Sequence, residues 1–171
     1  YTKMYYDMDI DLAPHQMHPM ELISQGKWNT DLISGYTSSS IGISEQVTLN
    51  VGVNAQVLTL NNSWALEPRA GIKWQFSPKS SFALAYGVHS RMEKMDVYFV
   101  KTQGTGNRSV NKDLGFTRAH YVMLSYRFKV SDNMTMKLEP YFQQLYDVPV
   151  IADSSYSVLN WRDFYVETAL V

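Results

Sequence analysis

Residues 47–57 read VTLNVGVNAQV, and this stretch decides the fold. Every second residue, from Val47 to Val57, is apolar, and the residues between them are polar or glycine. Side chains on a β-strand point alternately to two faces, so this pattern predicts a strand with one apolar and one polar face. An amphipathic helix would repeat its apolar residues every three or four positions instead.

The same alternation recurs along most of the chain. It is found in residues 3–12, 66–76, 81–88, 122–130 and 134–143, and more weakly in residues 32–43 and 164–171. No window has a comparable 3.6-residue period. We therefore predict about eight antiparallel strands and no substantial helix, in a single domain that covers residues 1–171.

The connections between these runs alternate in length. Residues 44–46, 77–80 and 131–133 are tight polar turns, whereas residues 91–118 and 147–162 are long connections. Outer-membrane barrels have short periplasmic turns and long extracellular loops. Many runs also reach ten or more residues, the length that a tilted membrane strand needs. The sequence therefore predicts up-and-down strands of a transmembrane β-barrel in the bacterial outer membrane, as about eight strands of a larger barrel.

Aromatic residues of the apolar faces gather beside the short turns, and two interpretations of them remain open. They are Trp74, Phe76, Phe82, Tyr126 and Phe128. In a barrel they would form a girdle at the boundary between membrane and water. In a soluble β-sandwich, possibly a carbohydrate-binding module, they would close the end of the core. We favour the barrel, in which every apolar side, including that of Met4, Tyr6 and Met8, faces hydrocarbon.

In this barrel the opposite side of each strand faces a hydrated lumen, where charged residues are tolerated. The lumen-facing residues predicted in this way are Glu67, Arg69, Lys73, Arg127, Lys137 and Glu139. A solvated sandwich face would accept them equally well. Pro140 lies inside a long run, and because proline has no backbone N–H, we expect a bulge or local break there.

Composition excludes several classes of function. The 171 residues contain 15 Lys and Arg and 16 Asp and Glu, so the charge balance does not indicate a nucleic-acid partner. Cysteine is absent, which excludes disulfides and cysteine-ligated metals. No stretch approaches 18 consecutive apolar residues, so no transmembrane helix is predicted. The chain opens on Tyr1 and stops inside an apolar run, and we expect it to be an internal piece of a longer protein.

The candidate metal and catalytic groups are weak. Asp7, Asp9 and Asp11 share one strand face but fit a solvated row as well as a Ca²⁺ site. His15 and His18 lack an evident third zinc ligand. No G-x-S-x-G motif or assignable carboxylate pair occurs, so we expect no enzyme activity, no metal and no cofactor. An outer-membrane lipid hydrolase would need a serine beside His120, and none can be assigned there.

The long connection over residues 91–118 is the predicted ligand-binding element. Long loops on a rigid scaffold commonly read ligands, and aromatic and basic side chains commonly anchor them. The predicted contact residues are Arg91, Lys94, Tyr98, Phe99, Lys101 and Arg108. The alternative is that this loop only shields the barrel mouth.

Five segments resemble the barrel of TonB-dependent receptors from Bacteroidetes. They are residues 47–56, 67–76, 81–90, 114–121 and 141–150, and the resemblance covers residues 30 to 165. It implies a 22-stranded barrel with an N-terminal plug, and energised uptake of a siderophore, haem, cobalamin, peptide or glycan. It also implies contact with outer-membrane lipid, coupling to the TonB complex through a plug that this sequence lacks, and a possible surface lipoprotein partner. Pro140 and the missing terminal strand depart from the family pattern.

Overall fold

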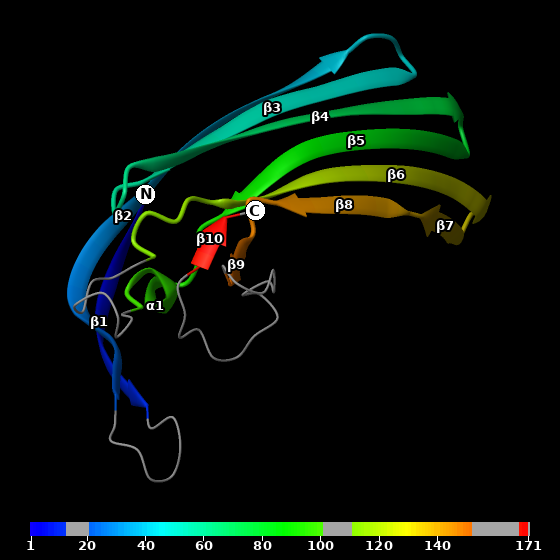
Figure 1. The fold of residues 1–171 in the computed structure, drawn as a ribbon. Helices are drawn as coiled ribbons and strands as arrows, with labels where there is room; N and C mark the ends of the chain where they lie inside the picture. Colours follow the sequence, from blue (N-terminus) through cyan, green and yellow to red (C-terminus); the bar gives the residue numbers. More distant parts are fainter. Residues whose placement is uncertain (13–20, 101–110, 152–167, 171) are drawn as a thin grey trace.

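The structure is a computed structural model that describes residues 1–12, 21–100, 111–151 and 168–170. In the described residues the chain is almost entirely β-structure (Figure 1). The strands are β1 (Thr2–Leu12), β2 (Glu21–Gly42), β3 (Val47–Leu58), β4 (Ser63–Ser77), β5 (Ser80–Arg91), β6 (Thr117–Ser131), β7 (Met134–Leu138), β8 (Tyr141–Tyr146), β9 (Pro149–Ile151) and β10 (Thr168–Leu170). One short helix, α1 (Met95–Tyr98), follows β5.

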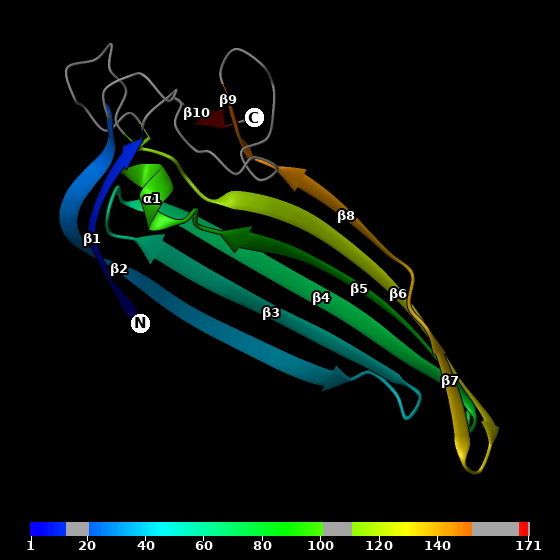
Figure 2. The ribbon, with the colours of Figure 1, turned by 90° about the horizontal axis from the view of Figure 1, so that it is seen from below.

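Eight of the strands form one antiparallel sheet in which neighbours along the chain are neighbours in space. The order is β1 to β7, and β8 also pairs with β6. The sheet curls into a half-barrel, with α1 on its concave side (Figures 1 and 2). β9 and β10 form a separate two-stranded sheet. The predicted up-and-down antiparallel architecture is confirmed.

Short turns lie at one end of the half-barrel, and their side chains satisfy backbone groups. The Ser44 hydroxyl accepts hydrogen bonds from the backbone N–H of Gln46 and Val47. Ser77 plays the same part for Lys79. Serine favours such turns because its hydroxyl can replace a backbone acceptor. The described residues that flank the longer connections lie at the opposite end (Figure 1).

Pro140 interrupts a ladder without changing its register. Leu138 pairs with Tyr126, and Tyr141 pairs with Met123, so two residues separate each pair on both strands. The Pro140 carbonyl still accepts a 3.0 Å hydrogen bond from the Leu124 N–H. Because proline has no backbone N–H, it cannot donate the second hydrogen bond of this pair. The strand is therefore divided into β7 and β8, which both pair with β6. The predicted break is confirmed, and it is not a bulge.

The register places the alternating large apolar residues of β3 to β6 on the convex face. Val47, Trp74, Phe82 and Tyr126 are partners in one row across four strands. Because partners in a ladder share a face, each row of the alternation is apolar from strand to strand. The largest exposed convex residues are Val51, Val57, Trp64, Leu66, Ile72, Trp74, Phe76, Leu84, Tyr86, Val122, Leu124, Tyr126, Phe128 and Val130.

The buried core lies on the other side, at the long-loop end. Leu58 and Ala65 belong to the concave faces of β3 and β4, and both are buried against α1 and the segment that precedes β6. The buried residues of this cluster are Tyr6, Leu58, Ala65, Val97, Tyr98, Phe99, Leu114 and Phe116. Helix α1 and the residues that flank it thus complete an apolar core with the few apolar side chains that the concave face offers at this end.

One sequence expectation is wrong in this region. Met4 and Tyr6 were expected on the same surface as the convex apolar residues, but the ladder places them on the concave face. Tyr6 stacks on Phe99 with ring centroids 4.8 Å apart. Alternation defines two faces for each strand but does not say which of them joins the neighbour's apolar side, so the sequence alone could not orient β1.

Candidate functional site

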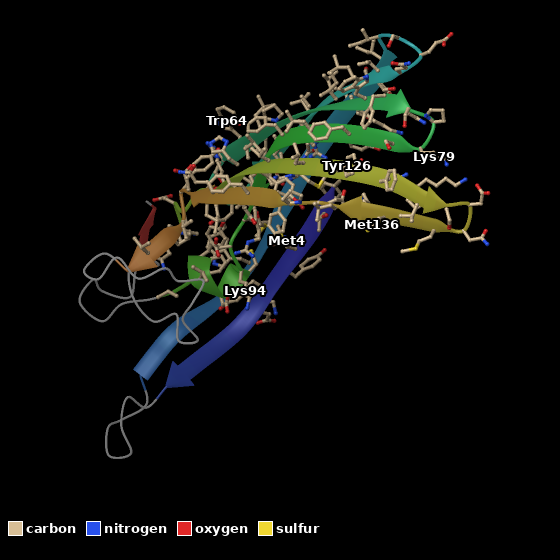
Figure 3. All side chains as sticks on the ribbon, turned by 90° about the vertical axis from the view of Figure 1, so that its right-hand side faces the viewer. Met4, Trp64, Lys79, Lys94, Tyr126 and Met136 are labelled. Carbon is tan, nitrogen blue, oxygen red and sulfur yellow. The ribbon has the colours of Figure 1, made fainter. Side chains whose placement is uncertain are left out.

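An aromatic belt crosses the convex face beside the short turns. Trp74 has a large apolar side chain, yet half of it is exposed. The centroid of its ring lies 5.3 Å from that of Phe76. Phe82 and Tyr126 continue its row, and Phe128 lies beyond them. Figure 3 shows Tyr126 and Met136 on this part of the sheet. The belt that the sequence predicts is therefore present as an arrangement of side chains.

A second aromatic group lies at the other end of the same face. Trp64 is 64% exposed, and on β6 the ring of His120 is stacked between Tyr86 and Tyr146. The Tyr86 hydroxyl is 2.9 Å from His120 Nδ1. His120 is thus held by two tyrosine rings on the convex face, and sequence reasoning had assigned it no such role.

The space between the two belts carries no formal charge on the strands that define it. From Trp64 to Phe76 the convex residues of β4 are Trp, Leu, Pro, Ala, Ile, Trp and Phe. Their register partners on β3 and β5, and residues 120 to 130 of β6, include no Asp, Glu, Lys or Arg on this face. The convex face is therefore an uncharged band bordered by aromatic rings.

This polarity reverses where β1 and β2 extend past the band. Among the described side chains of β2, Ile33 is the convex apolar residue nearest the start of the strand, and it pairs with Val57. Beyond it the convex positions are polar or charged, with a Lys27–Asp7 ion pair of 2.8 Å and a Tyr1 hydroxyl that donates to Asp31. At the same point the concave positions come to include the large apolar residues Leu32, Trp28 and Tyr6.

Aromatic stacking holds the concave side of this extension to the loop segment. Trp28 lies 5.7 Å from Phe99 between ring centroids, and Lys112 Nζ lies 3.5 Å from the centroid of the Trp28 ring. Phe99 therefore sits between Trp28 and Tyr6. Both faces of the sheet thus exchange polarity along one line that crosses β2 between Leu32 and Ile33.

All six residues predicted to face a lumen share the concave face. Glu67, Arg69 and Lys73 alternate on β4. Arg127 on β6 pairs with Lys137 on β7, on the side that carries Ser81 and Ser125. Lys137 forms an ion pair with Glu139, in which Nζ lies 2.7 Å from Oε1. This part of the concave face is polar, except where α1 and its flanking segment cover it.

Glu67 is the central polar residue of this wall. Its side chain is only 7% exposed. It accepts hydrogen bonds from Asn54 Nδ2 at 2.9 Å, Gln56 Nε2 at 2.8 Å, and both the backbone N–H and the hydroxyl of Ser90 at 2.7 and 2.6 Å. Arg69 Nη2 lies 3.4 Å from Oε2. A buried carboxylate is stable only when its oxygens are satisfied in this way.

The position of Glu67 follows from Pro68. The ladder between β4 and β5 begins at Arg69, so the start of β4 is not paired with β5. The Glu67 carboxylate takes the Ser90 N–H that a continued ladder would have bonded. On the same stretch of β4, Arg118 Nη2 donates to the Trp64 carbonyl at 3.2 Å. Side chains therefore close the gap that opens between the two strands.

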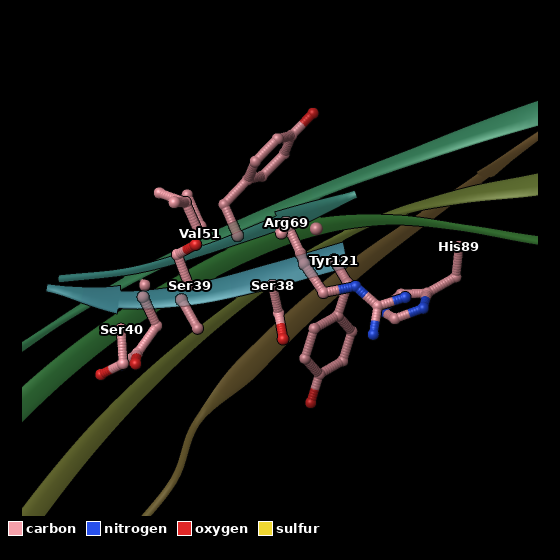
Figure 4. A pocket seen from close by; sticks show the side chains of 14 residues that line it. Ser38, Ser39, Ser40, Val51, Arg69, His89 and Tyr121 are labelled. Atoms are coloured by element: carbon pink, nitrogen blue, oxygen red, sulfur yellow. The ribbon is translucent and has the colours of Figure 1, made fainter. Parts of the chain in front are cut away.

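A hollow of about 450 Å³ lies next to Glu67 on the concave face (Figure 4). Its floor is low because Gly52, Gly71 and Gly87 stand at neighbouring concave positions. A Cβ atom at Gly52 would lie 3.0 Å from a backbone carbonyl oxygen, so the strands approach closely there. Arg69, His89 and Tyr121 project from the floor, and His89 and Tyr121 meet edge to face at 6.1 Å.

This concave hollow combines a guanidinium, an imidazole and a phenol over a floor that includes three glycines. Its volume is within the range of small-molecule sites, and polar groups converge on it from three strands. Sequence reasoning named Arg69 as lumen-facing but did not connect it with His89 or Tyr121. The glycines at positions 52, 71 and 87 were the available signal, because glycine inside a strand often marks close approach of another group.

The residues predicted to contact a ligand from the long connection differ in their placement. Tyr98 is fully buried and Phe99 is 1% exposed, so both rings pack in the core cluster rather than present themselves to a ligand. Burial raises the pKa of the Tyr98 hydroxyl to about 12. Arg91 and Lys94 are exposed at the rim. Lys101 and Arg108 lie outside the described residues.

The described residues do not form a metal site. In the described part of the chain, no group of three or more His, Asp or Glu side chains is placed to hold a metal ion. Asp7 instead pairs with Lys27. His15 and His18 fall outside the described residues, as do the side chains of Asp9 and Asp11.

Comparison with known proteins does not assign the chain to a family. No protein-family model matches the sequence, and no curated protein matches it. Among the described residues, no helix is both long enough and apolar enough to cross a bilayer.

Proposed function

We propose that this chain forms part of the wall of a bacterial outer-membrane β-barrel, in a receptor of the TonB-dependent kind that takes up a nutrient ligand. The supporting observation is the line at which both faces of the sheet exchange polarity. Below it the convex face is uncharged and the concave face is polar. Above it the convex face carries Lys27, Asp7 and Asp31, and the concave face contributes Tyr6 and Leu32 to the apolar cluster.

A membrane explains this reversal. Apolar side chains are stable outward only where hydrocarbon replaces water, and charges return outward where water returns. Trp64 and Trp74 lie ten residues apart on one face of β4. At about 3.3 Å per residue and a tilt of about 40°, their separation along the membrane normal is about 25 Å, the height of the apolar band of such barrels. A soluble sandwich would require a second sheet over the convex face, and the described residues contain none in that position.

The open edges of the sheet define what the wall requires. The described strands leave residues 33–42 of β2 without a partner on the side away from β3, and β7 and β8 pair only with β6. Unpaired backbone groups are not tolerated in hydrocarbon, so in a membrane both edges must pair with further strands. In this proposal those strands complete the barrel, and a plug outside this chain would provide the link to the TonB complex. A surface lipoprotein could cover the mouth.

The receptor part of the proposal is supported by the concave hollow. Arg69, His89 and Tyr121 could hold a polar or aromatic ligand such as a siderophore, haem, cobalamin, peptide or glycan. The site is placed on rigid strands, which keeps its geometry constant during binding. In a binding assay with representatives of these ligand classes, we expect one class to bind and Arg69→Gln to weaken it at least fivefold. Failure of every class would remove the receptor part and leave the membrane part standing.

Tryptophan quenching tests the membrane part directly. Three variants each retain one of Trp28, Trp64 and Trp74, with the other tryptophans, including Trp161, replaced by phenylalanine. In vesicles of lipids brominated near the headgroup, we expect strong quenching of Trp64 and Trp74, and little quenching of Trp28, which lies above the band. Trp28 is the matched control because it is also 46% exposed. Equal quenching of all three residues, or of none, contradicts the membrane assignment and favours the soluble sandwich.

A further inference from the structure

A second, smaller pocket lies on the concave face at the short-turn end. Its volume is about 190 Å³, and β4, β5 and β6 with the turn between β4 and β5 contribute most of its lining. Four of its residues are basic, namely Lys73, Lys79, Arg127 and Lys129. The hydroxyl residues Ser80, Ser81 and Thr135 lie among them.

The basic charges of this pocket exceed the acidic charges near it. Lys129 pairs with Asp132 at 2.9 Å, and the adjoining Lys137 pairs with Glu139 at 2.7 Å. Lys73, Lys79 and Arg127 form no ion pair with a described acidic residue. Five basic and two acidic side chains leave a net charge of +3. Like charges held together repel one another, and a bound anion relieves that repulsion.

The backbone around the pocket is held in place before any ligand arrives. The Ser77 hydroxyl accepts the N–H of Lys79, and the Lys79 carbonyl accepts a 2.8 Å hydrogen bond from the Lys129 N–H. Arg127 lies opposite Ser81 in the β5–β6 ladder. Two of the basic residues are thus fixed to each other through backbone bonds, which lowers the ordering cost of binding.

We propose that this basic pocket binds a soluble, multiply charged oxyanion, such as a phosphate or pyrophosphate group. The arginine fork and the lysine ammonium groups suit phosphate oxygens, and the serine and threonine hydroxyls can donate to the remaining ones. The pocket opens on the face opposite to Trp74, Phe82 and Tyr126. A lipid headgroup would follow the aromatic face, so the anion comes from solution. The choice of a soluble anion over a lipid headgroup rests on the proposed membrane assignment, whereas the presence of an anion site does not.

Calorimetric titration with inorganic pyrophosphate at low salt tests this inference, using the whole chain in a neutral detergent. We expect saturable binding whose affinity falls as salt rises, because screening weakens charge attraction. Arg127→Gln and Lys73→Gln should each weaken binding at least tenfold. Arg127→Lys should give an intermediate loss, because it retains the charge but not the fork. Lys3→Gln, on the far end of the sheet, is the matched control and should change affinity less than twofold.

Several outcomes overturn the proposal. These are the absence of binding, equal effects of Lys3→Gln and Arg127→Gln, or insensitivity to both pocket substitutions. Circular dichroism and tryptophan emission of each variant must match those of the original chain, which separates lost binding from lost folding. In a second arm, micelles doped with phosphatidylglycerol compete with pyrophosphate. Displacement by this lipid would identify a headgroup site and reject the soluble anion.

Discussion

Charge placed on the convex face provides the sharpest test of the membrane-spanning wall. Val122 and Met123 are neighbours on β6 that point to opposite faces, Val122 to the convex and Met123 to the concave face. Arginine at either position adds the same charge at the same height of the sheet. Any difference between Val122→Arg and Met123→Arg therefore reports which face is in contact with hydrocarbon.

The expected magnitude follows from the depth of Val122. Phe128 of the lower belt lies six positions further along β6. At about 3.3 Å per residue and a tilt of about 40°, Val122 lies about 15 Å above that belt, near the middle of a band of about 25 Å. Arginine at the midplane of such barrels costs about 2–4 kcal/mol, which is a factor of about 30 to 900 in the unfolding equilibrium. Met123→Arg, which faces water, should cost less than about 1 kcal/mol.

Denaturant unfolding in phospholipid vesicles, followed by tryptophan emission, measures both variants. Val130→Arg adds a depth control, because Val130 lies beyond Phe128 on the convex face and should cost only about 0–1 kcal/mol. If Val122→Arg unfolds with the free energy of the original chain, the convex face is in water. If Met123→Arg is as costly as Val122→Arg, the two faces are not distinguished by the solvent, and the reasoning fails.

Three further predictions concern the concave side. Glu67→Gln should cost about 2–3 kcal/mol of unfolding free energy, because the glutamine NH2 group would face the N–H groups that now donate to the carboxylate. Glu139 forms a more exposed ion pair, so the control Glu139→Gln should cost under about 1 kcal/mol. Equal values for the two variants in the same denaturant assay would contradict the network around Glu67. Phe99→Ala should cost about 3–5 kcal/mol and raise amide exchange in β1 and the start of β2, unless the stacking is incidental. Because burial raises the pKa of Tyr98 from 10.0 to about 12, the unfolded state loses its proton first, and stability should fall between about pH 10 and 12. Tyr98→Phe should flatten that fall in unfolding midpoints measured against pH, and an unchanged slope would refute it.

Much of the concave site was within reach of pattern reasoning, and part of it was not. Glu67, Arg69 and Lys73 were placed on one face by alternation alone, and the ladder confirms the shared face. The network around Glu67 depends on Ser90, which lies 23 residues away and approaches only because Pro68 opens the β4–β5 ladder. A pattern within one strand cannot predict a contact between residues so far apart in the sequence. Tyr98 and Phe99 are of the residue types that often anchor ligands, yet α1 and the residue after it place both rings in the core. Residue type alone does not say whether a side chain is buried.

The sequence by itself determined the strands, their turns and the break at Pro140, because a period of two and a missing N–H act locally and need no partner. It also determined which residues of a strand share a face. Only the tertiary structure decided which face of β1 joins the convex side of its neighbours, since register is a property of pairs of strands. The polarity reversal between Leu32 and Ile33 depends on the pairing of β1, β2 and β3, and the hollow at Arg69 and the basic pocket at Arg127 depend on the pairing of the later strands. They assemble side chains from strands far apart in the chain, and this is why they become visible only when the sheet is formed.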